Sequence, residues 1–368
     1  MKRKILPKPD YILLTVALAL LVFGLLAVSS ASTVLSYERF ENNYYYFLRQ
    51  LMFGAVPGLI LMYLLSRINY HFWQKVAPLL VLIGIILLVL VLVPGIGFKV
   101  GNARRWINFG FFLFQPAEFV KLATILYLAS WFDKRKQHVH DLYYGFLPSL
   151  AISALIAGLV MLEPDIGTML VLVAVVASMF FVGGAKLKHL ASAAGVGLLV
   201  FWLAIKAAPY RLQRILAYLN PQSDTLGISY QINQALLAIG SGGLWGLGFG
   251  QSRQKYNYLP EPIGDSIFAI MSEELGFARV ALVLLMFFIL AYRGFKIALS
   301  AQDNFGKMAA VGITSWIVLQ ALINIGGITK TIPLTGIPLP FVSYGSSALA
   351  LTLAGVGILL NISRYSRS

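Results

Sequence analysis

Ten apolar segments occur along the chain, and each has the length of a helix that crosses a bilayer. About 20 consecutive apolar residues are needed to span the hydrocarbon core of a membrane. The segments lie at approximately 11–31, 47–66, 74–93, 113–131, 144–162, 168–184, 187–207, 266–292, 307–328 and 342–361. They predict an all-α, polytopic integral membrane protein with about ten transmembrane helices, organised as a single domain over residues 1–368. The first segment is long for a signal peptide and more spans follow it, so we expect it to be retained.

Composition and charge support the same class. Hydrophobic residues make up 59% of the chain and charged residues 12%, whereas soluble domains have about 45–50% and about 25%. With the N-terminus inside, inner loops and chain ends carry sixteen Lys and Arg residues and the outer loops eleven. This bias accounts for the net charge of +15 without nucleic acid and predicts that both termini are cytoplasmic. The chain has no cysteine, and its histidines lie beside Lys or Arg at span ends, so we expect no metal site.

Two loops predicted on the outer side are unusual. The short loop 94–112 carries Lys99, Arg104 and Arg105 without an acidic residue. These cations either bind an anion or anchor the loop to lipid headgroups, and the sequence leaves both alternatives open. The large outer loop between the seventh and eighth helices, 207–265, contains a short amphipathic helix at 229–239 that we expect on the membrane surface. Its glycine-rich stretch favours tight turns or a close approach to a ligand, or is simply flexible.

Ionisable residues inside membrane spans are costly and are candidates for function. Glu118 and Lys121 lie three residues apart in the fourth span, so they share a helix face and can form an ion pair. The pair either only neutralises itself or presents Lys121 to an anionic substrate. The outer turn 163–168 places Glu163 and Asp165 at the membrane edge, where Asp165 either caps the next helix or contacts substrate.

The start of the eighth span holds a further group of acids. Asp265 lies where the helix begins, and it can serve as an N-cap, as a general base or as both. Glu273 and Glu274 follow about two turns deeper. Two adjacent acids at that depth predict that at least one faces a cavity or pairs with Arg279.

The last outer loop, 329–341, is apolar and rich in proline, which is typical of a re-entrant segment that lines a cavity or is buried in protein. Ser343 and Tyr344 follow it and offer hydroxyl groups. The candidate polar residues thus gather on the predicted outer side. A transporter more often places such residues near the midplane, so the pattern favours an enzyme that acts on a lipid-linked substrate at the outer face.

Five motifs, in order along nearly the whole chain, resemble those of the SEDS family (FtsW, RodA and SpoVE) of peptidoglycan glycosyltransferases. They are residues 101–107, 115–122, 163–168, 258–276 and 338–347. Residues 251–255 and the final serine pair of the last motif are more similar to the cell-division type, FtsW, than to the elongation type, RodA. The chain departs from the family pattern at Glu163 (usually Gln), at Ile263 and Gly264 before the aspartate, and at Ser346 (usually Gly).

The resemblance implies a cell-wall biogenesis enzyme that polymerises lipid II into glycan strands on the outer face of the bacterial inner membrane and releases undecaprenyl pyrophosphate. It implies that Asp265 is the general base and that Arg104, Arg105 and above all Lys121 stabilise the pyrophosphate. Glu118 is expected to hold Lys121 at the substrate. Four further residues are expected to contact the substrate: Asp165, Glu274, Ser343 and Tyr344.

The family further implies particular partners. These are a class B penicillin-binding transpeptidase and other divisome proteins, with location at the division septum if the chain is of the FtsW type. A divalent cation, Mg²⁺ or Mn²⁺, is a possible cofactor, although no ligand cluster indicates one. Three alternatives stay open: a lipid II flippase, an elongation-type (RodA-like) polymerase, and a scaffold that recruits the transpeptidase.

Overall fold

The computed structural model describes residues 8–100, 103–110, 112–136, 141–206, 218 and 227–366. The described part is mostly helical, with the following longer elements: α1 (Tyr11–Phe40), α2, η1 and α3 (together Tyr45–Arg67), α4 (His71–Leu92), α5 (Pro116–Lys134), η3 and α6 (together Leu142–Leu162), α7 (Ile166–Val182), α8 (Leu187–Lys206), α10 (Ile228–Gly242), α11 (Ile267–Ser300), α12 (Asn304–Ile328) and α13 (Ser346–Arg364). Residues 207–217 and 219–226 of the predicted large outer loop lie outside the described residues.

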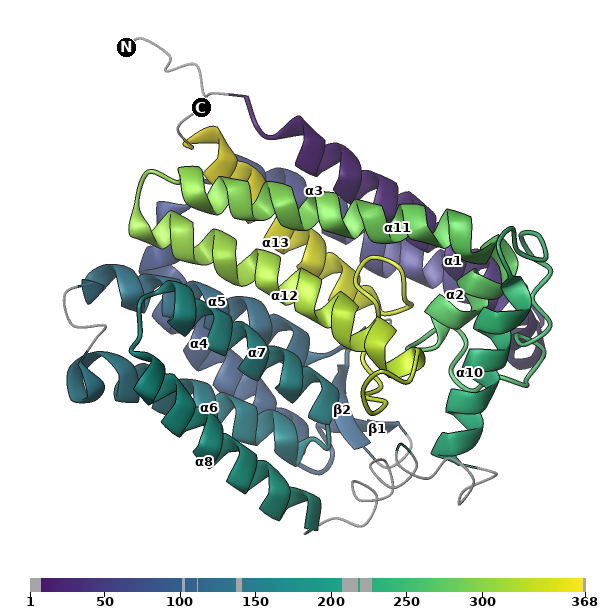
Figure 1. The fold of residues 1–368 in the computed structure, drawn as a ribbon, viewed down its shortest axis with the longest axis horizontal. Helices are drawn as coiled ribbons and strands as arrows, with labels where there is room; N and C mark the ends of the chain where they lie inside the picture. The colour runs from purple at the N-terminus through teal and green to yellow at the C-terminus, as the bar shows by residue number, and fades with distance from the viewer. Residues whose placement is uncertain are drawn as a thin grey trace.

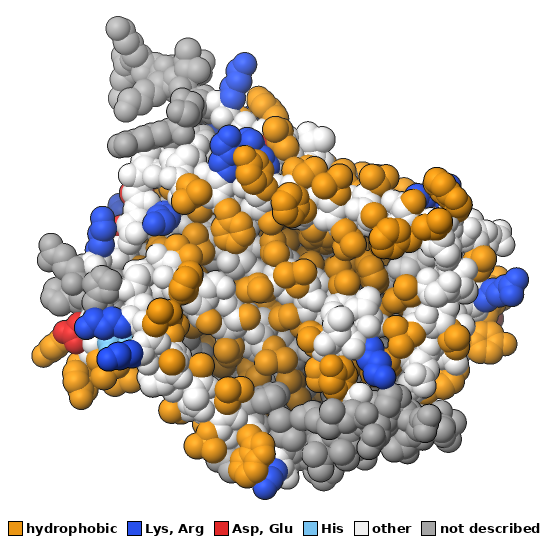
Figure 2. Space-filling view, in the orientation of Figure 1, with side chains coloured by type: hydrophobic (Ala, Val, Ile, Leu, Met, Phe, Trp, Pro, Cys, Tyr) orange, Lys and Arg blue, Asp and Glu red, His pale blue; other side chains and the backbone are white. Residues whose placement is uncertain are grey.

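Each of the ten predicted spans corresponds to one helical segment. Seven of these segments within the described ranges are long and apolar enough to cross a membrane, and the other three predicted spans correspond to α5, α7 and α8. Large hydrophobic side chains are exposed along the bundle, among them Leu282, Phe288 and Leu299 of α11. Figure 2 shows such side chains over much of one face of the molecule. The predicted all-α, multi-pass membrane fold is confirmed.

The helices pack side by side around α12, which contacts α5, α7, α11 and α13 (Figure 1). The start of α1 and the end of α13 lie at the same end of this bundle, because the backbone N–H of Asp10 donates to Ser363 Oγ at 3.0 Å. Asp10 also forms an ion pair with Arg293 at 2.6 Å. At the opposite end, α10 crosses the bundle instead of running along it, where the sequence predicted a surface helix at 229–239.

Residues 94–112 were predicted as a loop, and the structure shows strands in this segment. It forms a small antiparallel sheet in the order β1 (Gly97–Val100), β2 (Ala103–Asn108) and β3 (Leu113–Phe114). The fourth helix consequently begins at Pro116 and not at residue 113, because residues 113–114 pair with β2. Proline suits the first turn of a helix, where a missing N–H costs nothing.

The glycine-rich stretch serves to pack backbone against backbone. Helix α11 is kinked at Gly276, whose φ of 76° is left-handed. The loop fills this kink: the N–H groups of Leu247 and Gly248 donate to the carbonyls of Glu273 and Glu274 at 3.0 Å each. A Cβ on Gly246 would lie 2.2 Å from the carbonyl oxygen of Glu274, so no larger residue fits. The close approach predicted for these glycines is therefore to the helix backbone and not to a ligand.

Candidate active site

The candidate residues gather at the end of the bundle opposite the described chain ends. The small sheet, the start of α5, the 163–165 turn, the start of α11, α10 and the segment between α12 and α13 all lie there (Figure 1). That last segment, 329–345, is non-helical and largely buried, with Leu334, Ile337, Leu339 and Phe341 at most 5% exposed. A buried segment of this kind ties the helices together at the site.

Asp265 is half-buried, two residues before the first residue of α11. Ser266 is the N-cap position of that helix, so the predicted capping role of Asp265 is wrong. The Asp265 carboxylate accepts from Gln231 Nε2 of α10 at 3.3 and 3.4 Å and from Ser266 Oγ at 3.4 Å. Its backbone carbonyl accepts from Asn324 Nδ2 of α12 at 2.9 Å. The carboxylate is thus turned towards α10 while the backbone is held from α12.

Glu118 and Lys121 form the predicted ion pair, with Nζ 2.8 Å from Oε1. Lys121 Nζ also donates to Gln320 Oε1 at 2.7 Å and lies 5.1 Å from the ring centre of Trp316. Lys121 is 3% exposed and Glu118 is 1% exposed. The ammonium of Lys121 is enclosed by protein groups in this structure, and its contact with a substrate stays a prediction.

The turn between α6 and α7 is held by Arg105. Asp165 caps α7, as one of the two sequence alternatives had it, by accepting from Thr168 N at 3.1 Å and Thr168 Oγ1 at 2.9 Å. Arg105 Nε donates to the Glu163 carbonyl at 3.1 Å, its guanidinium also bonds the carbonyl of Pro164, and Nη1 lies 3.9 Å from Asp165 Oδ1. The guanidinium of Arg105 is therefore committed to this turn.

Glu163 has an unusual environment in the same turn. Its side chain is 0% exposed, and neither carboxylate oxygen has a hydrogen-bond partner among the described residues. Burial, and after it the neighbouring Asp165, raises the pKa of Glu163 to about 9, although Arg105 acts in the opposite direction. At neutral pH the side chain is a neutral acid, which explains how Glu replaces the usual glutamine here.

Arg104 differs from Arg105 in its surroundings. Successive side chains of a strand point to opposite faces, so Arg104 faces away from the turn that Arg105 holds. Its cross-strand partner is Lys99 of β1. Like charges placed opposite each other repel. An anion bound against Lys99 and Arg104 would relieve this repulsion.

Ser343 and Tyr344 join the last loop to the start of α11. Ser343 Oγ donates to the Gly264 carbonyl at 2.7 Å and accepts from Leu339 N at 2.8 Å, and Tyr344 N donates to the Ile263 carbonyl at 2.8 Å. Burial raises the pKa of the Tyr344 phenol to about 12, so the group stays protonated at neutral pH. Their backbone and hydroxyl contacts position the residues that precede Asp265.

Glu274 does not have the surroundings of a substrate contact. It pairs with Lys255 at 3.1 Å and accepts from Ser30 Oγ at 2.7 Å and Gly250 N at 3.0 Å. The predicted partner of the two acids, Arg279, instead donates to the Trp245 carbonyl at 3.0 Å. Both oxygens of Glu274 are engaged and the side chain is 0% exposed, so its role is to hold the loop that fills the kink in α11.

Sequence analysis missed Gln231, Lys255, Gln320 and Asn324. An amide inside an apolar span is a signal for Gln320 and Asn324, because a buried polar group needs partners in a membrane. Gln231 and Lys255 carry no such signal, since they lie in the large loop.

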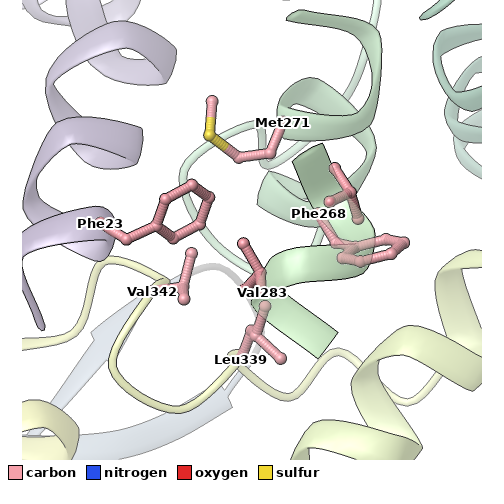
Figure 3. Close-up of a pocket in the computed structure, with 7 residues that line it drawn as sticks. Phe23, Phe268, Met271, Val283, Leu339 and Val342 are labelled. Carbon is pink, nitrogen blue, oxygen red and sulfur yellow. The ribbon is translucent and has the colours of Figure 1, made fainter. Parts of the chain in front are cut away.

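An apolar pocket lies beside the site. It is lined by Phe23, Phe268, Met271, Val280, Val283, Leu339 and Val342, so α1, both halves of α11 and the last loop contribute to it (Figure 3). The pocket begins one turn after Asp265 and holds no polar lining residue. Its lining side chains offer no hydrogen-bond partner to the polar part of a substrate.

Within the described residues, no group of three or more His, Cys, Asp or Glu side chains is arranged to hold a metal ion. The predicted divalent cation thus has no ligand set made of protein groups alone here. Mg²⁺ is commonly held by one or two carboxylates together with substrate phosphates. Asp265 could supply one such carboxylate.

The sequence profile of the FtsW/RodA/SpoVE family, described as cell cycle protein, matches residues 10–368. The chain belongs to this family. It is 46% identical to stage V sporulation protein E of Bacillus subtilis (strain 168), over 98% of each chain. It is 43% identical to the probable peptidoglycan glycosyltransferase FtsW of Trichlorobacter lovleyi, over 96% of this chain and 93% of the relative.

Solved structures of family members share the fold. A chain described under "Structural coordination of polymerization and crosslinking by a peptidoglycan synthase complex" superposes with a TM-score of 0.79 at 28% identity, over 97% of this chain and 98% of that one. The rod shape determining protein RodA of Thermus thermophilus superposes with a TM-score of 0.71 at 28% identity, over 98% of each chain. The resemblance read from the motifs is confirmed at the level of family and fold.

Proposed function

We propose that this chain is a peptidoglycan glycosyltransferase that polymerises lipid II into glycan strands at the outer face of the bacterial cytoplasmic membrane. The observation that carries the proposal is the placement of Asp265. Its half-buried carboxylate lies at the end of the bundle opposite the described chain ends, held by Gln231 and Ser266 and backed by Asn324. The names of its relatives as peptidoglycan glycosyltransferases support the same activity.

Asp265 acts as the general base. A hydroxyl of the incoming lipid II sugar forms a bond to the anomeric carbon of the growing strand, and its proton passes to the Asp265 carboxylate. The bond from that carbon to the pyrophosphate breaks, and its electron pair leaves on the undecaprenyl pyrophosphate. The Asp265 carboxylate accepts hydrogen bonds from Gln231 Nε2 at 3.3 and 3.4 Å, which orient it for this step.

Cations of the small sheet stabilise the departing pyrophosphate. The structure favours Arg104 over Arg105 and Lys121 for this contact, because Arg105 is engaged by the 163–165 turn and Lys121 is enclosed. Lys99 lies opposite Arg104 and adds a second positive charge. A fixed positive charge at the position where negative charge builds up is a large contribution to such reactions. If a divalent cation binds, Asp265 would help to hold it and it would add positive charge near the departing pyrophosphate, and no step here depends on it.

Partners and location follow from the same proposal. Both chain ends are cytoplasmic, which places Asp265 outside. A class B penicillin-binding transpeptidase crosslinks the new strands, in accord with the structural neighbour that coordinates polymerisation and crosslinking. The identity to relatives named FtsW and stage V sporulation protein E favours a role in cell division, with other divisome proteins, or in sporulation, over side-wall elongation.

The test uses the purified full chain with its cognate transpeptidase and labelled lipid II. Glycan chains resolved by gel electrophoresis are the expected product. A parallel assay measures lipid II movement across liposomes that contain the chain. Movement without polymer would refute the polymerase and support the flippase.

A further inference from the structure

Helix α12 carries two buried amides one turn apart on its face towards the site. Gln320 and Asn324 are each 2% exposed in a helix whose other core residues are mostly apolar. An amide buried in this way is costly unless it is hydrogen-bonded. The hydrogen-bond partners of these two amides therefore indicate which parts of the structure they hold in place.

Asn324 joins the start of α11 to the last loop. Its Nδ2 donates to the Asp265 carbonyl at 2.9 Å and to the Ile337 carbonyl at 2.7 Å, so both amide hydrogens are used. Two carbonyl partners fix the orientation of the amide, since its oxygen cannot replace the nitrogen there. Asp265 precedes the first helical residue of α11. The bond from Asn324 holds its backbone in place, as the hydrogen bonds of a helix hold an interior residue.

Gln320 makes the matching connection to the buried cation. Its Oε1 accepts from Lys121 Nζ at 2.7 Å and from Trp316 Nε1 at 2.9 Å. Its Nε2 donates to the carbonyl of Pro338 at 3.0 Å, the residue next to the one that Asn324 binds. A continuous chain of hydrogen bonds thus runs from Lys121 through Gln320, the last loop and Asn324 to the backbone of Asp265.

We propose that Asn324 and Gln320 are positioning residues that fix Asp265, through its backbone carbonyl and the last loop, at the place where it takes the proton. The proposal rests on the polymerase function proposed above and assigns Lys121 to the support of this chain. Neither amide contacts substrate. Loss of either one displaces the base by up to about 1 Å and leaves the substrate contacts in place.

The test compares polymerisation kinetics of the purified full chain with those of Asn324→Leu, which removes both donors at similar volume. We expect kcat to fall by about 10- to 100-fold with KM for lipid II within about twofold of wild type, because misplacement of a catalytic group by about 1 Å costs that much. Asn324→Ser, which is too short to bridge both carbonyls, replaces Asn324→Leu if that variant does not fold, and the same outcome is expected. Thr314→Val is the matched control, since Thr314 is a fully buried α12 residue that faces Gly294.

Variants of Gln320 provide a second test of the same proposal. Gln320→Glu keeps the acceptor for Lys121 and Trp316 but loses the donor to Pro338, so it should lower kcat as much as Gln320→Met does. Asn324 variants with the kcat of wild type, or with a KM change in place of the kcat change, would overturn the inference and leave the polymerase intact. Absence of polymer from the wild-type chain would overturn the polymerase itself, and the inference with it.

Discussion

The carboxyl group of Glu163 is the most informative position for a stability measurement. It is 0% exposed and unbonded among the described residues, and its raised pKa of about 9 follows from burial first and from Asp165 second. Glutamine has nearly the same shape, carries no charge and offers two donors to the same space. Glu163→Gln therefore removes the cost of ionisation while keeping the packing.

The magnitude and its sign follow from the two pKa values of this group. The ordinary value is 4.5 and the folded value about 9, and each pH unit between them is worth about 1.4 kcal/mol. Because the unfolded chain loses this proton first, the free energy of unfolding falls as pH rises from about 4.5 to about 9 and is unaffected below that range. Relative to wild type, Glu163→Gln should gain about 3 kcal/mol at pH 7, about 6 kcal/mol at pH 9 and nothing near pH 4.

The assay is thermal unfolding of the purified chain in detergent at pH 5, 7 and 9, followed by tryptophan fluorescence. We expect the midpoint of Glu163→Gln to exceed that of wild type by several °C at pH 7 and by more at pH 9. Glu41→Gln, at an exposed acid, is the matched control and should show no such trend. A difference between Glu163→Gln and wild type that does not grow with pH would refute the reasoning.

Four further substitutions separate contacts with substrate from contacts that hold the fold. Arg104→Ala should lower the polymerisation rate at unchanged thermal stability, whereas Arg105→Ala should destabilise by about 1–3 kcal/mol through the lost bonds to the 163–165 turn, as read by kinetics and thermal unfolding. Lys255→Met leaves Glu274 buried without its partner and should cost about 3–5 kcal/mol; an unchanged unfolding midpoint would contradict the buried ion pair. Gly246→Ala should abolish folded, monodisperse protein on size exclusion, because its Cβ would overlap the Glu274 carbonyl at a φ of 79°.

Much of the fold was predictable because bilayer-spanning helices leave a strong local pattern. The length and apolar content of α1, α4 and α12 are visible in the sequence without any tertiary information. The small sheet was not predictable in the same way, since its short strands depend on pairing across the 94–112 loop. The start of α5 at Pro116 was misplaced for that reason.

The candidate site was predicted in its residues more than in its contacts. The pair of Glu118 and Lys121 followed from helix spacing, and Asp165 as a cap followed from its place before α7. Spacing along one helix says nothing of other helices, so Gln320 above Lys121 was not foreseen. The ion pair of Glu274 with Lys255 was missed for the same reason, since it joins a helix to a distant loop.

The central claim is that Asp265 is the base of a lipid II polymerase, and one measurement tests it most directly. Wild type, Asp265→Asn and the control Glu261→Gln, at an exposed acid four residues earlier, are each supplied with labelled lipid II in complex with the transpeptidase. The account predicts glycan polymer from wild type and Glu261→Gln and none from Asp265→Asn at equal thermal stability. Polymer from Asp265→Asn at the wild-type rate would contradict it.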